Sequence, residues 1–355
     1  MSRGGTPWPP LFGIKRFWNM AESIRSVPPG FDLVARQSPK ISAREWRIHG
    51  LLFVLTIITT IFAGIMWGAP PDLPTPEPRL ATPLDYLLYI PLTYYYSIVE
   101  LVTYTVEHPA LIGEGVKFSV SLLAILFSHE MGHYLECRHY KVDATLPYFI
   151  PAPPIFLAGT FGAFIKIRAA IPTRRALFDI GLAGPLAGFV VALPICVIGV
   201  LTVGPPVAGE HLMYFNDPLL FRLIGKLAGV PLDPNSPANP YYMAGWIGLL
   251  VTSLNLMPVG QLDGGHGTFA VFGGRAHKFI GRVVFVIVAA LAVLGFLWHG
   301  SPSGFLYTVL LAVMMKVPHP QPAVMEPLGT KRIAIGIITL IVFALCFLPF
   351  PITIS

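Results

Sequence analysis

The sequence predicts an all-α polytopic membrane protein with about six to seven transmembrane helices and one re-entrant, β-like segment. Of its 355 residues, 54% are hydrophobic and only 12% are charged, whereas a soluble domain carries roughly 25% charged residues. The mean hydropathy is +0.67, and the chain is long enough for several spans of about 20 residues each. The 36 prolines and 34 glycines predict broken helices and re-entrant backbone around a cavity.

The remaining composition excludes several classes of function. The net charge of +6 comes from basic residues scattered over the connections, with no stripe or motif, so no nucleic-acid partner is expected. Cys137, Cys196 and Cys346 are isolated and are expected to be small hydrophobes that are buried or face lipid. The first apolar run begins near Leu51, too late for a cleavable signal peptide.

Residues 1–48 form a Pro-rich basic segment with eight Lys/Arg against three acidic residues, which the positive-inside rule assigns to the cytoplasm. A first span is expected from about His49 to Trp67, followed by an outer Pro-rich stretch, Ala69–Pro83. Tyr86–Val106 is apolar and aromatic but contains Pro91. We expect an interfacial helix there, with a full span as the alternative.

The next segments alternate between membrane and loop. Leu111–Leu135 is expected to enter from outside and end inside. Leu146–Ile171 is too rich in proline and glycine to be a helix, and its FLAGTFGAFIKI stretch predicts one or two short strands that dip into the membrane from inside. A span over Leu177–Val203, an outer loop over Gly204–Pro240 and an inward span over Tyr241–Leu262 follow.

Three further apolar segments lie near Phe279–Trp298, Phe305–Met315 and Ile333–Phe350, after a basic cluster that marks the inside again. The middle segment is short for a span. The chain therefore divides into a cytoplasmic segment (1–48), a first span with its outer segment (49–110), a core (111–266) and C-terminal transmembrane helices (267–355).

The chemistry is concentrated in residues 122–134, LLAILFSHEMGHY. His129 and His133 are four residues apart, so on a helix both imidazoles project from one face and can share one Zn²⁺. Glu130 is placed to take a proton from a water molecule that the metal activates. Three polar residues at the inner end of an apolar helix are expensive unless they have a function.

A third ligand is needed, because catalytic zinc usually takes three protein ligands. Asp263 fits: it ends the expected fourth span in NLMPVGQLDGG, where Gly264 and Gly265 permit close backbone approach. Pro258 should interrupt the helix and free backbone groups that line a polar cavity. The alternative role for Asp263 is a helix cap or a turn. His266 is a possible hydrogen-bond partner of the site, and His319 is expected to be a loop residue.

The motifs HEMGH (129–133), GLAGP (181–185) and NLMPVGQLDGG (255–265) together resemble the site-2 protease family of intramembrane zinc metalloproteases, peptidase family M50. The segment LPYFIPAPPIFLAGTFGAFIKI resembles the branch that contains the chloroplast EGY proteins and bacterial relatives and that lacks a PDZ domain. This resemblance covers roughly Leu122–His266.

The resemblance implies one zinc ion per chain, held by His129, His133 and Asp263, with Glu130 as the catalytic carboxylate. It also implies a core of three helices, which bear the three motifs. Asn255 matches a family asparagine that steadies the substrate carbonyl, and an interhelical hydrogen bond is its alternative role. The glycines and the proline of GLAGP are expected to be structural.

The expected function is hydrolysis of peptide bonds within or near transmembrane segments of single-span membrane proteins. An extended substrate could add to the glycine-rich strand around Leu157–Ile167 by β-augmentation. A bacterial inner membrane is expected, with the N-terminus and the active-site side cytoplasmic. The sequence identifies neither the substrate nor the oligomeric state.

Two other functions account for part of the pattern. A transporter or channel could use intramembrane His and Asp to bind a translocated cation, but it has no need for Glu130 between the two histidines. A non-catalytic scaffold descended from a protease would typically lose the glutamate or a ligand, and this chain keeps all of them.

Overall fold

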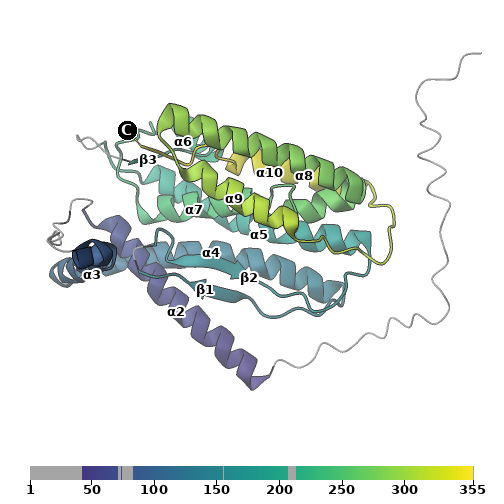
Figure 1. Cartoon of the computed structure of the whole chain (residues 1–355), viewed down its shortest axis with the longest axis horizontal. Coiled ribbons are helices and arrows are strands. Elements are labelled where there is room, and N and C mark those ends of the chain that lie inside the picture. The colour runs from purple at the N-terminus through teal and green to yellow at the C-terminus, as the bar shows by residue number, and fades with distance from the viewer. Residues whose placement is uncertain (1–41, 71–72, 74–82, 155, 207–212, 355) are drawn as a thin grey trace, which may run out of the picture. The chain divides into compact units, whose positions relative to one another are not determined.

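The computed structural model describes residues 42–70, 73, 83–154, 156–206 and 213–354, which belong to one compact unit of the chain, 38–355. These residues form the helices α2–α10 and the short strands β1–β4 (Figure 1). Most of the basic segment 1–48 and of the expected outer stretch 69–83 lies outside the described residues.

Helices α2 (Ala43–Gly68) and α4 (Ala110–His139) cross at very short range. A β-carbon on Gly64 would lie 2.8 Å from Gly115 Cα, and one on Gly115 would lie 2.6 Å from the Ile61 carbonyl oxygen. At the same crossing the Thr60 and Ser119 hydroxyls are 2.7 Å apart. Small residues and a buried hydroxyl pair are the usual means by which apolar helices associate without a hydrophobic driving force.

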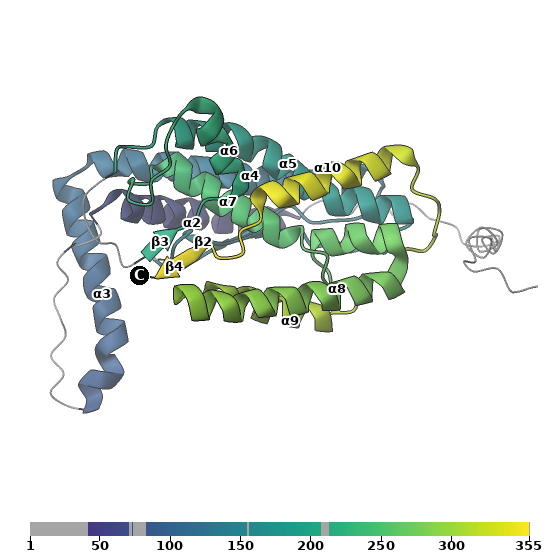
Figure 2. The ribbon, with the colours of Figure 1, turned by 90° about the horizontal axis from the view of Figure 1, so that it is seen from above.

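Helix α3 (Pro83–Glu107) continues through Pro91 and runs across the direction of α4 and α5. Figure 1 shows it end-on and Figure 2 along its length, and it touches little of the bundle beyond α4. It is not among the four helices whose length and composition suit a membrane span. Whether α3 lies at the membrane interface or spans the membrane stays a prediction.

The segment that follows α4 forms a β-hairpin. Strands β1 (Tyr148–Pro151) and β2 (Thr160–Phe164) pair antiparallel. Strand β2 confirms a strand in the FLAGTFGAFIKI stretch, whereas β1 lies before that stretch and was not predicted. The Pro147 carbonyl lies 3.0 Å from His49 Nδ1 at one end of α2, and Trp67 Nε1 donates to the Leu157 carbonyl at the other end, at 2.8 Å. The hairpin therefore follows about 27 Å of α2 at 1.5 Å per residue, close to the roughly 30 Å of a bilayer core. Its re-entrant position in a membrane stays a prediction.

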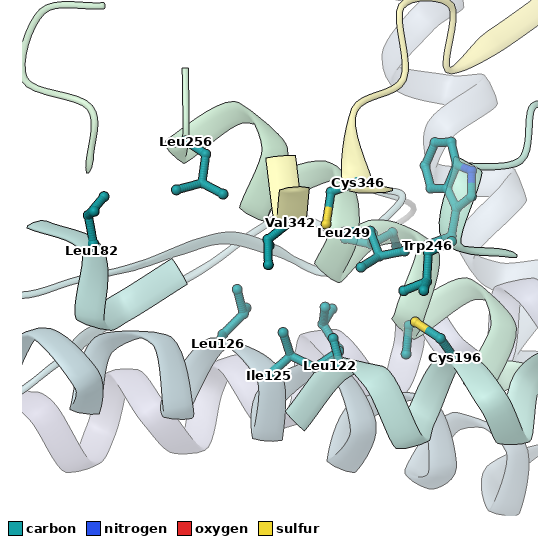
Figure 3. Packing of buried hydrophobic residues seen from close by; sticks show 14 of the residues in the cluster. Leu122, Ile125, Leu126, Leu182, Cys196, Trp246, Leu249, Leu256, Val342 and Cys346 are labelled. Atoms are coloured by element: carbon teal, nitrogen blue, oxygen red, sulfur yellow. The ribbon is translucent and has the colours of Figure 1, made fainter. Parts of the chain in front are cut away.

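Helices α5 (Arg174–Leu201) and α7 (Pro240–Asn255) pack against α4 and against each other. Thr173 and Asn239 cap their N-termini through side-chain acceptors. Figure 3 shows the apolar layer where α4, α5, α7 and α10 meet. Its labelled side chains within these helices are Leu122, Ile125, Leu126, Leu182, Cys196, Trp246, Leu249, Val342 and Cys346.

The expected span Tyr241–Leu262 is wrong in its last seven residues. Helix α7 ends at Asn255, an irregular segment of seven residues follows, and Asp263 begins α8 (Asp263–His299) instead of ending a span. The interruption at Pro258 is confirmed. The connection from α7 to α8 packs tightly at the glycine pair, because a β-carbon on Gly264 would lie 1.9 Å from the Leu256 carbonyl oxygen.

Helix α8 consists of two helical segments that meet at Gly273, whose φ of 77° and ψ of 170° are not helical. The second segment folds back along the first. A β-carbon on Gly281 would lie 3.5 Å from the Pro258 carbonyl oxygen, beside the start of α8 rather than far beyond it. The expected span Phe279–Trp298 corresponds to this second segment.

The C-terminal part contains α9 (Ser303–Lys316), α10 (Thr330–Cys346) and β4 (Ile352–Ile354). β4 pairs with β3 (Met213–Phe215) of the expected outer loop, which also holds α6 (Leu219–Ala228). At the opposite end of α10, Arg332 forms a two-pronged ion pair with Asp179 of α5, with nitrogen–oxygen distances of 2.5 to 3.0 Å. This pair holds α10 against the start of α5.

Four helices, α2, α4, α5 and α8, are long and apolar enough to cross a membrane. Of the described helices expected to cross as well, α7 has 16 residues, α9 has 14 and α10 has 17. A polytopic, mostly helical membrane protein is confirmed, and the count of six to seven spans stays a prediction.

The α2–α4 crossing generates a paired test. Gly115→Ala places a methyl group against the Ile61 carbonyl, whereas Gly113, on the same helix, has nothing within 4 Å of an added β-carbon. We expect Gly115→Ala to lower the unfolding temperature in detergent. Gly113→Ala should leave it unchanged or raise it, since alanine gains about 1 kcal/mol over glycine in a helix. Equal shifts for the two variants would contradict the close crossing.

Candidate metal centre

The last third of α4 places His129, Glu130 and His133 inside the bundle. Their exposed fractions are 4%, 6% and 7%, so all three polar groups are removed from solvent. The two imidazoles lie on one face of the helix, as four-residue spacing predicts. Their Nε2 atoms are 3.1 Å apart.

Asp263 reaches the same point from the first turn of α8. Its Oδ2 lies 3.2 Å from His129 Nε2 and 3.3 Å from His133 Nε2. The structure thus brings together the three residues that the sequence suggested as ligands, although Asp263 comes from the start of a helix. A β-carbon on the neighbouring Gly265 would lie 2.5 Å from the Gly260 carbonyl oxygen, so the glycine pair lets this chain segment double back tightly.

Helix α5 shapes the other wall of the site. A β-carbon on Gly184 would lie 2.1 Å from His133 Nε2, and one on Gly188 would lie 3.1 Å from His129 Cβ. On α4 itself, a β-carbon on Gly132 would lie 2.5 Å from the Ala183 carbonyl oxygen. The glycines of GLAGP therefore serve close helix packing, as predicted, and also leave room for the imidazole rings.

The backbone of α5 orients His133. Its Nδ1 donates to the Ile180 carbonyl oxygen at 2.6 Å. A carbonyl can only accept a hydrogen bond, so the proton of the neutral ring is on Nδ1 and the lone pair of Nε2 faces Asp263. Sequence reasoning missed Ile180, because a backbone carbonyl acts independently of the residue type; the nearby GLAGP motif was the available signal.

These donors fit a bound metal ion. One nitrogen from each histidine and one Asp263 oxygen all lie within 4.8 Å of one another. The Nε2 of His133 and the Asp263 carboxylate face each other at 3.3 Å, a contact that needs either a proton or a metal ion between the two acceptor atoms. Two imidazoles and one carboxylate are a donor set that zinc takes in catalytic sites, with a position left for water or substrate.

Glu130 lies beside these donors and is separate from them. Its Oε1 is 4.0 Å from His129 Nε2, and its carboxylate lies near the backbone of Ile165, directly after β2. The hairpin and the donor set therefore flank the same carboxylate.

Asn255, the last residue of α7, is also at the site. Its Nδ2 lies 3.4 Å from His129 Nε2, so the structure places this amide next to the donors, as expected. His266 lies one turn beyond Asp263 on α8, and its Nδ1 is 2.9 Å from His319 Nε2. His319, expected to be a plain loop residue, is thus the second contact that sequence reasoning missed.

Comparison with known proteins agrees with this geometry. A family model described as Peptidase family M50 matches residues 117–297, which is half of the chain. The match includes His129, Glu130, His133 and Asp263. No solved structure gives a significant match.

Several curated plant proteins are similar over most of the chain. "Probable zinc metalloprotease EGY1, chloroplastic" of Arabidopsis thaliana is 29% identical over 320 residues, covering 86% of this chain and 53% of the relative. The protein of the same name from Oryza sativa subsp. japonica is 29% identical over 321 residues, covering 86% of this chain and 50% of the relative.

A further relative, "Probable zinc metalloprotease EGY2, chloroplastic" of Oryza sativa subsp. indica, is 30% identical over 258 residues, covering 70% of this chain and 45% of the relative. The chain spans about half the length of the curated relatives it matches. With the family match over 117–297, these similarities show that the chain belongs to peptidase family M50, the site-2 protease family.

Proposed function

We propose that this protein is an intramembrane zinc metalloprotease that hydrolyses peptide bonds within or near the transmembrane segments of other membrane proteins. One observation carries the proposal: a buried His129–His133–Asp263 donor set with its reactive atoms within 4.8 Å, and Glu130 directly beside it. The family membership and the names of the relatives support the same activity.

One zinc ion per chain fits the donor set, with His129, His133 and Asp263 as its ligands. When bound, zinc supplies a Lewis acid that polarises a peptide carbonyl and makes a water molecule more acidic. The hydrogen bond from His133 to Ile180 holds that ring in the orientation required for binding. Burial of the donors keeps bulk water from competing for the ion.

Glu130 moves the proton in this proposal. Its carboxylate accepts a proton from the water that attacks the carbonyl carbon, the carbon–nitrogen bond breaks, and the same proton is returned to the leaving amine nitrogen. Asn255 is placed to donate an amide hydrogen bond to the carbonyl oxygen as negative charge develops there. Neither role requires these two side chains to bind zinc.

The β-hairpin offers a way to present a substrate. A peptide bond in a transmembrane helix is hydrogen-bonded and shielded, so the substrate must unwind before it can react. Within the described residues the hairpin is a two-stranded sheet, which leaves a strand edge for an extended peptide. Because the end of β2 lies near Glu130, a strand added there would reach the donor set. Single-span membrane proteins are the substrate class that this arrangement suits.

We further propose that the N-terminal segment and the metal centre face the cytoplasmic side, or its equivalent in another compartment. The basic residues near the site end of the helices, Arg168, Arg174, Arg175, Arg275, Lys278 and Arg282, support this orientation. The plant relatives are named chloroplastic, which does not support the expected bacterial inner membrane.

The protease proposal predicts that Glu130→Gln separates chemistry from metal binding. Glutamine keeps the size and hydrogen bonding of the side chain but cannot accept the proton. We expect near-normal zinc content and expression, with cleavage of a single-span substrate in proteoliposomes reduced by roughly 10²- to 10⁴-fold.

Glu136→Gln is the matched control, because it is the same change on the same helix at a residue outside the donor set; it should cleave at the wild-type rate. Wild-type cleavage by Glu130→Gln, or by zinc-stripped protein, would remove the protease assignment.

The orientation predicts opposite labelling of two introduced cysteines. Lys226 and Arg275 are exposed residues, one in α6 of the expected outer loop and one in the basic cluster, while the three native cysteines are buried. In intact vesicles, an impermeant thiol reagent should reach Lys226→Cys and Arg275→Cys from opposite sides. The protein without an introduced cysteine gives the background, and labelling of both from one side would overturn the orientation.

A further inference from the structure

An irregular segment, Val317–Gly329, joins α9 to α10; we name it the strap. Its backbone is tied to the start of α5, because Arg174 N donates to the Val324 carbonyl at 2.9 Å and Ala323 N donates to the Ile171 carbonyl at 3.3 Å. The strap lies outside the matched residues 117–297. The strap therefore crosses the end of the bundle at which α5 begins.

The strap and the end of α9 also hold the segment that leads into Asp263. Gln261 Nε2 donates to the Pro318 carbonyl oxygen at 2.5 Å. A β-carbon on Gly260 would lie 2.2 Å from the Met314 carbonyl oxygen, so the two backbones touch. The position of Asp263 thus depends on residues at the end of α9 and in the strap, which come after α8 in the sequence.

His319 makes the strap's most specific contact. Its Nδ1 lies 2.8 Å from the Pro320 carbonyl and its Nε2 lies 2.9 Å from His266 Nδ1. Burial lowers the pKa of His319 to about 4, so the ring is neutral near pH 7. Since the carbonyl can only accept, Nδ1 carries the proton and Nε2 accepts a hydrogen bond from His266. Hydrogen bonds are therefore donated in one direction, from His266 to His319 and from His319 to the Pro320 carbonyl.

The surroundings of His319 connect both segments of α8. The ring stacks on Phe269 of the first segment, with centroids 4.3 Å apart and an interplanar angle of 5°. On the second segment, His277 has its ring centroid 5.0 Å from that of His319. His277 is 4% exposed, and its Nδ1 has no hydrogen-bond partner among the described residues. His319 thus bridges the fold-back at Gly273.

His266 transmits this contact to the metal centre. It lies three residues after Asp263, on the same face of the first turns of α8. A β-carbon on Gly181 would lie 2.7 Å from His266 Cβ, so His266 is wedged against α5 next to Ile180, whose carbonyl orients His133. Any shift of His266 moves the turn that carries Asp263.

We propose that His319 is a positioning residue of the metal centre: by holding His266, it fixes the first turn of α8 and keeps the Asp263 carboxylate against His129 and His133. The inference rests on the proposed function, which assigns these three residues to zinc. The strap is then part of the site, although none of its side chains touches the ion.

The test compares two replacements of His319 in the full-length protein in detergent, with zinc affinity measured by competition with a chelator. His319→Phe keeps a ring for the stack on Phe269 but removes the Nε2 acceptor. His319→Gln keeps an acceptor oxygen at a similar reach. We expect His319→Phe to weaken zinc binding by about 10- to 100-fold, as is usual when a residue that orients a ligand is lost, and His319→Gln to restore most of the affinity.

Two controls separate positioning from folding. Met325→Ala changes an exposed residue of the same strap and should leave zinc affinity unchanged. The metal-free forms of wild type and of both His319 variants should all unfold well above the assay temperature, so that a difference in zinc affinity reports positioning and not loss of the fold. If His319→Phe does not fold, His319→Ala removes the same acceptor without adding bulk and carries the same expectation.

The outcomes are distinct. Wild-type zinc affinity in His319→Phe, or an equal loss in His319→Phe and His319→Gln, would overturn the positioning role. Asp263→Ala serves as the reference for loss of a ligand. If Asp263→Ala loses zinc while His319→Phe keeps it, only the strap proposal fails; if Asp263→Ala keeps its zinc, the ligand assignment of the proposed function fails and the strap proposal with it.

Discussion

Three acceptor groups that converge inside an apolar bundle impose the strongest constraint on this molecule. The two imidazole nitrogens and the Asp263 oxygen lie within 4.8 Å of one another, and such a cluster is costly to bury unless a cation balances it. To bring the groups together, α4, α5 and α8 must approach far more closely than helices with ordinary side chains. Gly184 and Gly264 occupy the points where a β-carbon would collide with the His133 ring or with backbone, and a β-carbon on Gly188 would press on His129 Cβ at 3.1 Å. The glycines that allow the helices to pack closely are therefore also needed to bring the three polar groups together.

A hairpin, rather than another helix, lies beside the site. Between its ends a helix pairs its backbone groups with one another and presents no free edge, whereas a two-stranded sheet keeps one edge on each strand available. The hairpin is fastened to α2 at His49 and Trp67, so its unpaired edge is held at a fixed place while its end reaches Glu130. In the proposed function, an extended substrate bound there would meet the Glu130 carboxylate.

Much of this arrangement follows from local sequence. The remaining parts of the arrangement depend on tertiary contacts. The shared face of His129 and His133 follows from helical spacing, strand β2 from the glycine-rich stretch that contains it, and the break after α7 from Pro258. The sequence could not show that Asp263 begins a helix, because that depends on Gly264 lying under the Leu256 carbonyl.

Two contacts of the site were beyond sequence reasoning for a different reason. The Ile180 carbonyl that orients His133 is backbone and has no residue signature. His319 lies in a loop without periodicity, and only the fold-back of α8 at Gly273 brings His266, Phe269 and His277 around it. The glycine pair at 273–274 indicates a break, but not the direction in which the chain continues.

The most direct test of the central claim is X-ray absorption at the zinc K-edge on the purified, zinc-loaded protein. With His129, His133 and Asp263 as ligands, the spectrum should require two imidazoles, with nitrogen and oxygen neighbours only at about 2.0–2.2 Å, and Asp263→Ala should remove the bound zinc. A sulfur neighbour at about 2.3 Å, or a zinc shell with fewer than two imidazoles, would contradict the account.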